Sequence, residues 1–141
     1  MLDTHVWLWW INADNANLDK EQWRIFVQRE RRVGVSAISC FEVAWLECHN
    51  RIRLKIPLAF WFEKATVDSG IEIVPISPAI AELAANLPEH HSDPQDRLII
   101  ATAIVHKAKL LSADRKFAAY EELDSFLMSI PSIAVPKRND Q

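Results

Sequence analysis

Short apolar runs typical of buried strands alternate along this chain with longer stretches of helical periodicity, and this alternation constrains the fold most. Each strand-like run is followed by a helix, so consecutive strands are joined by right-handed crossovers and run parallel. A parallel sheet needs helices on both faces to bury it. The sequence therefore predicts an α/β fold, a single three-layer α/β/α domain over residues 1–136, followed by a polar tail at 137–141.

Several expected helices have clear start and stop signals. Ser77-Pro78 and Asp93-Pro94 each combine an N-cap residue with proline at the first helical position. Asn50 suits the left-handed turn that ends a helix. The expected strands are the first two residues, 33–37, 71–76, 108–113 and 133–135. The expected helices are the stretch after Asp3, 18–31, 39–49, 57–70, 78–86, 94–108 and short pieces within 116–128.

Composition excludes several classes of protein. A length of 141 residues fits one domain, and 50% hydrophobic residues exclude a disordered chain. A net charge of −3 argues against a protein that coats nucleic acid, because such proteins concentrate positive charge. A nucleic-acid enzyme stays open if its acids share one pocket. With only two glycines there is no phosphate-binding glycine loop, which excludes P-loop proteins and dinucleotide-binding proteins.

The sequence also bears on the compartment. No basic leader precedes the first apolar stretch, and the longest apolar run, 98–105, is far shorter than a membrane span. Cys40 and Cys48 lie on one expected helix, about 12 Å apart, which is too far for a disulfide. We interpret both as packed thiols and expect a cytoplasmic protein without a membrane segment.

Acidic and hydroxyl side chains gather where the expected strands end. In an open parallel sheet this edge is where ligands bind. The residues are Asp3, Ser36, Ser39, Glu42, Asp93, Asp96 and Asp114. Each has a structural alternative: Ser39 and Glu42 have the spacing of a capping box, Asp93 and Asp96 suit a helix N-terminus, and Asp114 suits a turn. Asp3 is the hardest to explain structurally, because it directly follows a central strand.

The electrostatic energy of these acids, taken together, favours a functional site. Two like charges about 6 Å apart repel by roughly 2.8 kcal/mol at an effective dielectric constant near 20. Four carboxylates contain six such pairs, and their summed repulsion rivals the stability of a small domain. Such a cluster persists by taking up protons or by binding cations. Oxygen ligands favour Mg²⁺ or Mn²⁺, whereas His5, His90 and His91 and the two cysteines lack the spacing of a zinc site.

Four segments together resemble the PIN-domain ribonucleases, and among them the VapC-type toxins of type II toxin–antitoxin systems. They are LDTHVWLWW (2–10), VSAISCFEVAWL (35–46), DPQDRLIIATA (93–103) and LLSADRKF (110–117). The resemblance covers essentially the whole chain. It implies a PIN-like domain with a central parallel sheet of about five strands, and a Mg²⁺- or Mn²⁺-dependent endoribonuclease that cleaves RNA with a metal-activated water.

The resemblance also implies roles for individual residues. The family's four acids, which bind the metal and are catalytic, fall on Asp3, Glu42, Asp96 and Asp114. Supporting positions that steady carboxylates or waters are Thr4, Ser36, Ser39, Asp93 and Ser112. Candidates for contacts to RNA phosphates are Arg97, Arg115 and Lys116, although a solvated helix face explains them equally well.

Two features depart from the family pattern. Only Met1 and Leu2 precede the first acid, so the first strand is short or the true start lies upstream. Ser112 stands where relatives often carry threonine. Neither departure removes a residue that the chemistry needs.

Partners follow from the resemblance and from the aromatic residues. Family members usually dimerise and are inhibited by a cognate antitoxin. The tryptophans of the first helix and the segment 60–62 exceed what one small core needs, so we expect a homodimer with an apolar groove for an antitoxin helix. One alternative is a non-catalytic PIN-fold module that acts through antitoxin or RNA binding. A haloacid dehalogenase-type phosphatase is disfavoured because His5 stands where its second acid would be, and a phospho-receiver domain lacks the paired acids.

Overall fold

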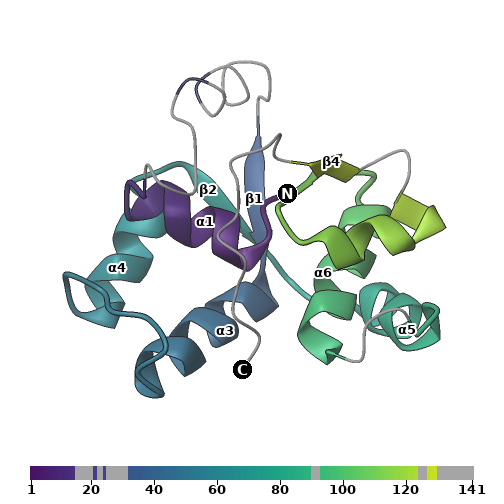
Figure 1. Ribbon diagram of the computed structural model, residues 1–141, viewed down its shortest axis with the longest axis horizontal. Coiled ribbons are helices and arrows are strands. Elements are labelled where there is room, and N and C mark those ends of the chain that lie inside the picture. The colour runs from purple at the N-terminus through teal and green to yellow at the C-terminus, as the bar shows by residue number, and fades with distance from the viewer. Residues whose placement is uncertain (15–20, 22–23, 25–31, 90–92, 124–126, 130–141) are drawn as a thin grey trace.

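The computed structural model describes residues 1–14, 32–89, 93–123 and 127–129, with positions 21 and 24 (Figure 1). Its helices are α1 (Thr4–Ile11), α3 (Ala37–Cys48), α4 (Leu58–Ala65), α5 (Pro78–Asn86) and α6 (Pro94–Val105), with 3-10 helices η1 (Arg115–Ala119) and η2 (Glu121–Leu123). Its strands are β1 (Val33–Ser36), β2 (Ile71–Val74), β3 (Leu110–Ser112) and β4 (Leu127–Ser129).

A single residue, Leu2, joins two pairs of parallel strands into one sheet. β1 pairs with β2, and β3 pairs with β4, both in parallel. Leu2 forms parallel bridges to Val35 on one side and to Leu111 on the other. Its N–H donates to the carbonyl of Gly34 at 2.9 Å, while the N–H of Leu111 donates to Met1 at 2.9 Å. The order is therefore β2-β1-Leu2-β3-β4, and the expected parallel sheet of about five strands is confirmed.

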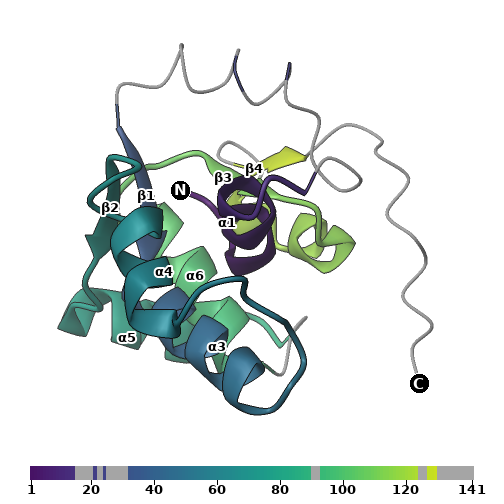
Figure 2. The ribbon, with the colours of Figure 1, turned by 90° about the vertical axis from the view of Figure 1, so that its left-hand side faces the viewer.

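Alternate residues of the sheet face two separate hydrophobic clusters. Leu2 and Leu111 belong to one cluster, which α1, α3 and α4 cover. Their chain neighbours Met1 and Leu110 belong to the other, which α5, α6 and η1 cover. Figure 1 shows α1, α3 and α4 on one side of β1 and α5 and α6 on the other, and in Figure 2 the side with α3 and α4 faces the viewer. This alternation is what a three-layer α/β/α domain requires, because successive side chains of a strand point to opposite faces.

Several expected element boundaries are confirmed. α5 starts at Pro78 with Ser77 as its N-cap, and α6 starts at Pro94 with Asp93 as its N-cap. Asn50 follows α3 with a φ of 54°, in the left-handed region. The expected helix at 18–31 and the expected strand at 133–135 lie outside the described residues, apart from positions 21 and 24.

Other boundaries were wrong. β1 ends at Ser36 and α3 begins at Ala37, two residues before the expected Ser39, because the Ser36 hydroxyl caps the helix. α4 ends at Ala65 rather than at position 70, because Thr66 leaves the helical region with φ −121° and ψ −85°. Residues 127–129 form β4 instead of helix, since pairing with β3 supplies hydrogen bonds that local propensity does not anticipate.

Two buried tryptophans anchor the α1–α4 layer. Trp7 and Trp61 are almost fully buried and meet edge to face, with ring centroids 5.0 Å apart. The indole N–H of Trp7 donates to the carbonyl of Ala65 at 3.1 Å. Trp9 and Trp10 are half-buried against the same cluster, so the tryptophans of α1 serve the core first. The expectation that one of them lies at a protein contact stays a prediction.

The cysteine side chains agree only in part with expectation. Both cysteines are free thiols, but only Cys40 is half-buried, whereas Cys48 is exposed. Within the described ranges, no helix combines the length and the apolar character that spanning a bilayer demands.

The position of Leu2 generates the first prediction. Leu2 is fully buried between both halves of the sheet. We expect Leu2→Ala to lower the free energy of unfolding by about 3 kcal/mol, as buried leucine truncations do. Val67→Ala, at a side chain that is 80% exposed, is the control and should cost less than about 0.5 kcal/mol. Equilibrium urea denaturation measures both, and equal costs would contradict the central role of Leu2.

Candidate active site

The candidate site lies at the edge of the sheet where the strand order reverses. In the sheet, Leu2 lies between β1, which follows it next in the chain, and β3, which comes much later. The carboxyl ends of these strands therefore flank a topological switch point. Asp3 follows Leu2 directly, and Ser112 ends β3. α3 contacts both α1 and α6 and lies below β1 in Figure 1.

Asp3 is held firmly in this edge. It is 5% exposed and is the N-cap of α1, with Oδ1 accepting the N–H of Val6 at 2.9 Å. Oδ2 accepts a short hydrogen bond from the Ser112 hydroxyl, which also accepts the N–H of Asp114 at 3.0 Å. Burial raises the pKa of Asp3 to about 6, although both hydrogen bonds oppose the rise. Ser112 thus ties Asp3 to the segment that carries Asp114.

Glu42 is oriented by a hydroxyl from α1. Thr4 donates to Oε2 of Glu42 at 2.6 Å and is hydrogen-bonded to the Ser39 hydroxyl at 2.9 Å. Ser36, rather than Ser39, caps α3 by accepting the N–H of Ile38 at 3.3 Å. The capping-box alternative for Ser39 and Glu42 is therefore wrong, because both lie inside the helix.

Asp93 and Asp96 occupy different positions at the start of α6. Asp93 is exposed and acts as the N-cap, its Oδ1 accepting the N–H of Gln95 at 2.9 Å. Asp96 lies in the first turn and is half-buried. The sequence-based N-cap assignment of Asp93 is confirmed.

The acids from four parts of the chain influence one another. Burial, which is the largest cause, and the negative charges of Asp93, Glu42, Asp114 and Asp3, in that order, together raise the pKa of Asp96 to about 7. Asp114 and Glu42 likewise raise the pKa of Asp3. Because these effects fall off with distance, the fold brings Asp3, Glu42, Asp96 and Asp114 into one electrostatic neighbourhood.

The donor set fits a hard cation, but the side chains do not form a finished coordination shell. Among the described residues, no three Asp, Glu, His or Cys side chains lie together closely enough to hold a metal ion. The grouped donors are carboxylate oxygens with serine and threonine hydroxyls beside them, which is the chemistry that Mg²⁺ and Mn²⁺ prefer. A divalent cation would relieve the repulsion that raises both pKa values.

The basic side chains proposed for phosphate contacts differ in their surroundings. Arg97 donates to backbone carbonyls at the end of α5, which favours a structural role over a phosphate contact. Lys116 is exposed in η1, two residues after the Asp114 N-cap. Arg115 begins η1, but its side chain lies outside what the structure describes. His5 stacks on Trp9, with ring centroids 6.2 Å apart.

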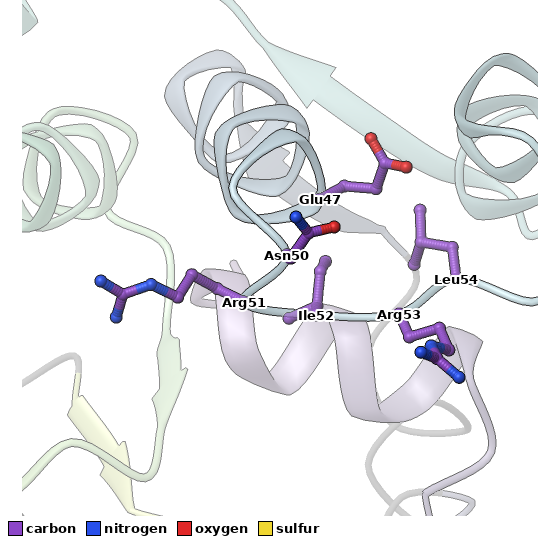
Figure 3. Close-up of a pocket in the computed structure, with 6 residues that line it drawn as sticks. All are labelled: Glu47, Asn50, Arg51, Ile52, Arg53 and Leu54. Carbon is purple, nitrogen blue, oxygen red and sulfur yellow. The ribbon is translucent and has the colours of Figure 1, made fainter.

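A pocket of about 350 Å³ lies elsewhere, at the end of α3 (Figure 3). Its lining residues are Glu47, Asn50, Arg51, Ile52, Arg53 and Leu54. None of the four coupled acids lines it, and the guanidinium groups of Arg51 and Arg53 point away from each other (Figure 3). The pocket is therefore separate from the candidate site.

The comparison with known proteins agrees with this architecture. A family model described as the PIN domain matches residues 1–123. The chain belongs to the PIN-domain family. It is 36% identical over 121 residues to Ribonuclease VapC22 of Mycobacterium tuberculosis, covering 85% of this chain and 90% of that protein.

A solved structure shows the same fold. It is VapBC2 from Rickettsia felis bound to a DNA fragment from their promoter, with a TM-score of 0.65 and 20% sequence identity. The similarity covers 92% of this PIN-domain chain and 96% of the other. The resemblance inferred from the four sequence segments is thus confirmed at the level of family and fold.

The raised pKa values generate the second prediction. The folded protein holds these protons more tightly than the unfolded chain, so this contribution to stability is complete below the ordinary value of 3.8. It is lost as pH rises through about 6 for Asp3 and about 7 for Asp96. In EDTA at pH 8, we therefore expect Asp96→Asn to melt a few degrees above wild type if about 1 kcal/mol of repulsion is relieved.

Thermal melts at several pH values test this. The difference should vanish near pH 4, where Asp96 is protonated, and should shrink or reverse in millimolar Mg²⁺, since wild type gains more from binding. Asp68→Asn, at an exposed turn, is the control. If Asp96 only stabilises the start of the helix, the asparagine variant will melt lower, equally with and without metal.

Proposed function

We propose that this PIN-domain protein is a Mg²⁺- or Mn²⁺-dependent endoribonuclease and the toxin component of a type II toxin–antitoxin module. The 36% identity to a ribonuclease over most of both chains supports the reaction class. The observation that carries the proposal is that Asp3, Glu42, Asp96 and Asp114 come together near the switch point of the sheet, where the charges of Glu42 and Asp114 help to raise the pKa values of both Asp3 and Asp96. A group of acids that takes part in no chemistry would gain nothing from retaining this electrostatic repulsion.

Each acid has a proposed role. Asp3, Asp96 and Glu42 hold the principal ion, and Asp114 completes that site or helps to hold a second ion. When bound, the ion would supply an activated water and stabilise the charge on the departing oxygen. Asp3 enters this arrangement already fixed by Ser112 and the helix start, and Glu42 is fixed by Thr4.

The hydroxyl residues act by orientation. The Ser112 and Thr4 hydroxyls donate to carboxylate oxygens, so each leaves the remaining lone pairs of its acid for a cation. Lys116 and Arg115 follow Asp114 and are the proposed contacts to RNA phosphates. They would balance the negative charge of the site as the polyanion approaches.

We also propose a homodimer, an antitoxin partner and a cytoplasmic location. Apolar side chains outside the core support a protein interface: Phe60 on α4 is 63% exposed, and Phe41 on α3 is 55% exposed. Exposed aromatic side chains of this size are common at protein contacts. The solved structure with the same fold contains VapBC2, and by analogy we propose a VapB-like partner here.

Cleavage of RNA is the direct test. We expect mixed-sequence RNA to be cut in Mg²⁺ or Mn²⁺ but not in EDTA, with 3′-hydroxyl and 5′-phosphate ends, because water attacks and the 2′-hydroxyl is idle. Asp96→Asn should lose at least about 100-fold in rate, a barrier increase of about 2.7 kcal/mol. Asp68→Asn is the matched control and should cleave as wild type does. Products ending in 2′,3′-cyclic phosphate would overturn the mechanism.

Light scattering tests the assembly. We expect a mass of twice 16.2 kDa at micromolar concentration, because the exposed aromatic side chains are covered in a dimer. Adding the product of the neighbouring small gene should increase the size further. A monomer that does not grow with that partner would remove both proposals and leave the cleavage test standing.

A further inference from the structure

The helix that carries Asp96 has a middle segment that is buried on all sides. Five consecutive residues of α6, 99–103, are all buried, so apolar groups face nearly every direction. The hydrophobic effect is non-directional, so burial of this segment does not by itself determine which way the polar first turn faces. Since Asp96 is useful only when it points to the sheet edge, a directional contact must fix the rotation of α6.

Arg97 supplies such a contact. Its Nε donates to the carbonyl of Ala84 at 3.0 Å, and Nη1 donates to Pro88 at 3.1 Å. Nη2 donates to the carbonyls of Leu87 at 2.5 Å and Ala85 at 3.3 Å. One guanidinium therefore holds four backbone carbonyls at the end of α5, and α5 is the helix against which α6 packs most extensively.

The end of α5 explains why arginine is needed. The last carbonyls of a helix lack partners within the helix, and a left-handed glycine often helps to satisfy them. Here the C-cap is Leu87, with φ −60° and ψ 147°, so the chain leaves in an extended conformation without such a turn. A planar guanidinium satisfies several carbonyls at once and places positive charge at the negative end of the helix. Lysine, with a compact charge, does not reproduce this fork.

Arg97 and Asp96 are neighbours that point in different directions. Successive residues of an α-helix are rotated by about 100°, so fixing Arg97 against α5 fixes the direction of Asp96. We propose that Arg97 is a positioning residue that locks the rotation of α6 and thereby aims the Asp96 carboxylate at Asp3, Glu42 and Asp114. Its effect on metal binding rests on the proposed function.

The test uses Arg97→Lys, which keeps the charge, and Arg97→Met, which keeps most of the length. Arg53→Lys and Arg53→Met are matched controls, because Arg53 is exposed and lines the separate pocket. Mn²⁺ binding without RNA is followed by electron paramagnetic resonance, and RNA binding in EDTA by fluorescence anisotropy at several salt concentrations. Hydrogen exchange of the peptide amides at 93–98 reports the rotation lock without any metal.

We expect both Arg97 variants to bind Mn²⁺ at least tenfold more weakly, as outer partners of metal ligands do when lost, and to exchange faster at 93–98. RNA affinity in EDTA and its salt dependence should stay within twofold of wild type. The Arg53 variants should match wild type in Mn²⁺ affinity and exchange at 93–98.

Other outcomes overturn the proposal. Unchanged Mn²⁺ affinity and exchange in folded Arg97 variants would show that Arg97 does not position Asp96. A loss of RNA affinity, with a salt dependence that falls by about 0.7 for one lost phosphate contact on a single strand, would show that it contacts RNA instead. If wild type binds no Mn²⁺ and cleaves no RNA, the proposed function fails, while the exchange data still decide whether Arg97 locks α6.

Discussion

The backbone of Leu2 is the connection on which the rest of this domain depends. It is hydrogen-bonded to β1, and the residues beside it are hydrogen-bonded to β3, so the two halves of the sheet meet at one residue. The same connection places Asp3 at the switch point, because Asp3 is the next residue and its N–H donates to Leu111 at 3.1 Å. The backbone hydrogen bonds that hold the two halves of the sheet together therefore also fix the position of Asp3.

That arrangement forces a carboxylate into a desolvated position, and the domain offsets the cost with hydroxyls. Ser112 and the start of α1 bind Asp3, and Thr4 binds Glu42. These bonds lower the cost without removing it, since the pKa of Asp3 still lies at about 6. Complete compensation would also remove the attraction for a cation. An incompletely satisfied acid cluster is therefore what the proposed metal site requires.

Local signals predicted much of this architecture. Ser77-Pro78 and Asp93-Pro94 marked two helix starts correctly, because a cap involves residues that are adjacent in sequence. The rule that parallel strands end at one edge gathered acids that the structure shows to be coupled. The failures were non-local. Whether Ser36 or Ser39 caps α3 depends on where β1 stops pairing with β2, and β4 exists only because β3 offers it an edge.

Arg97 shows that a residue next to an active-site acid in the sequence need not contact the same ligand. Its place beside Asp96 suggested a partner for phosphate, yet neighbours in a helix diverge by about 100° and face different surroundings. Its actual partners are backbone carbonyls nine to thirteen positions earlier, and no side-chain motif predicts such contacts. The sequence did contain one signal for this contact. No glycine follows α5, so the last carbonyls of the helix needed a hydrogen-bond donor from another segment. A motif that joins an acid to an arginine can therefore combine two tasks, with the acid facing the chemistry and the arginine fixing the helix that presents it.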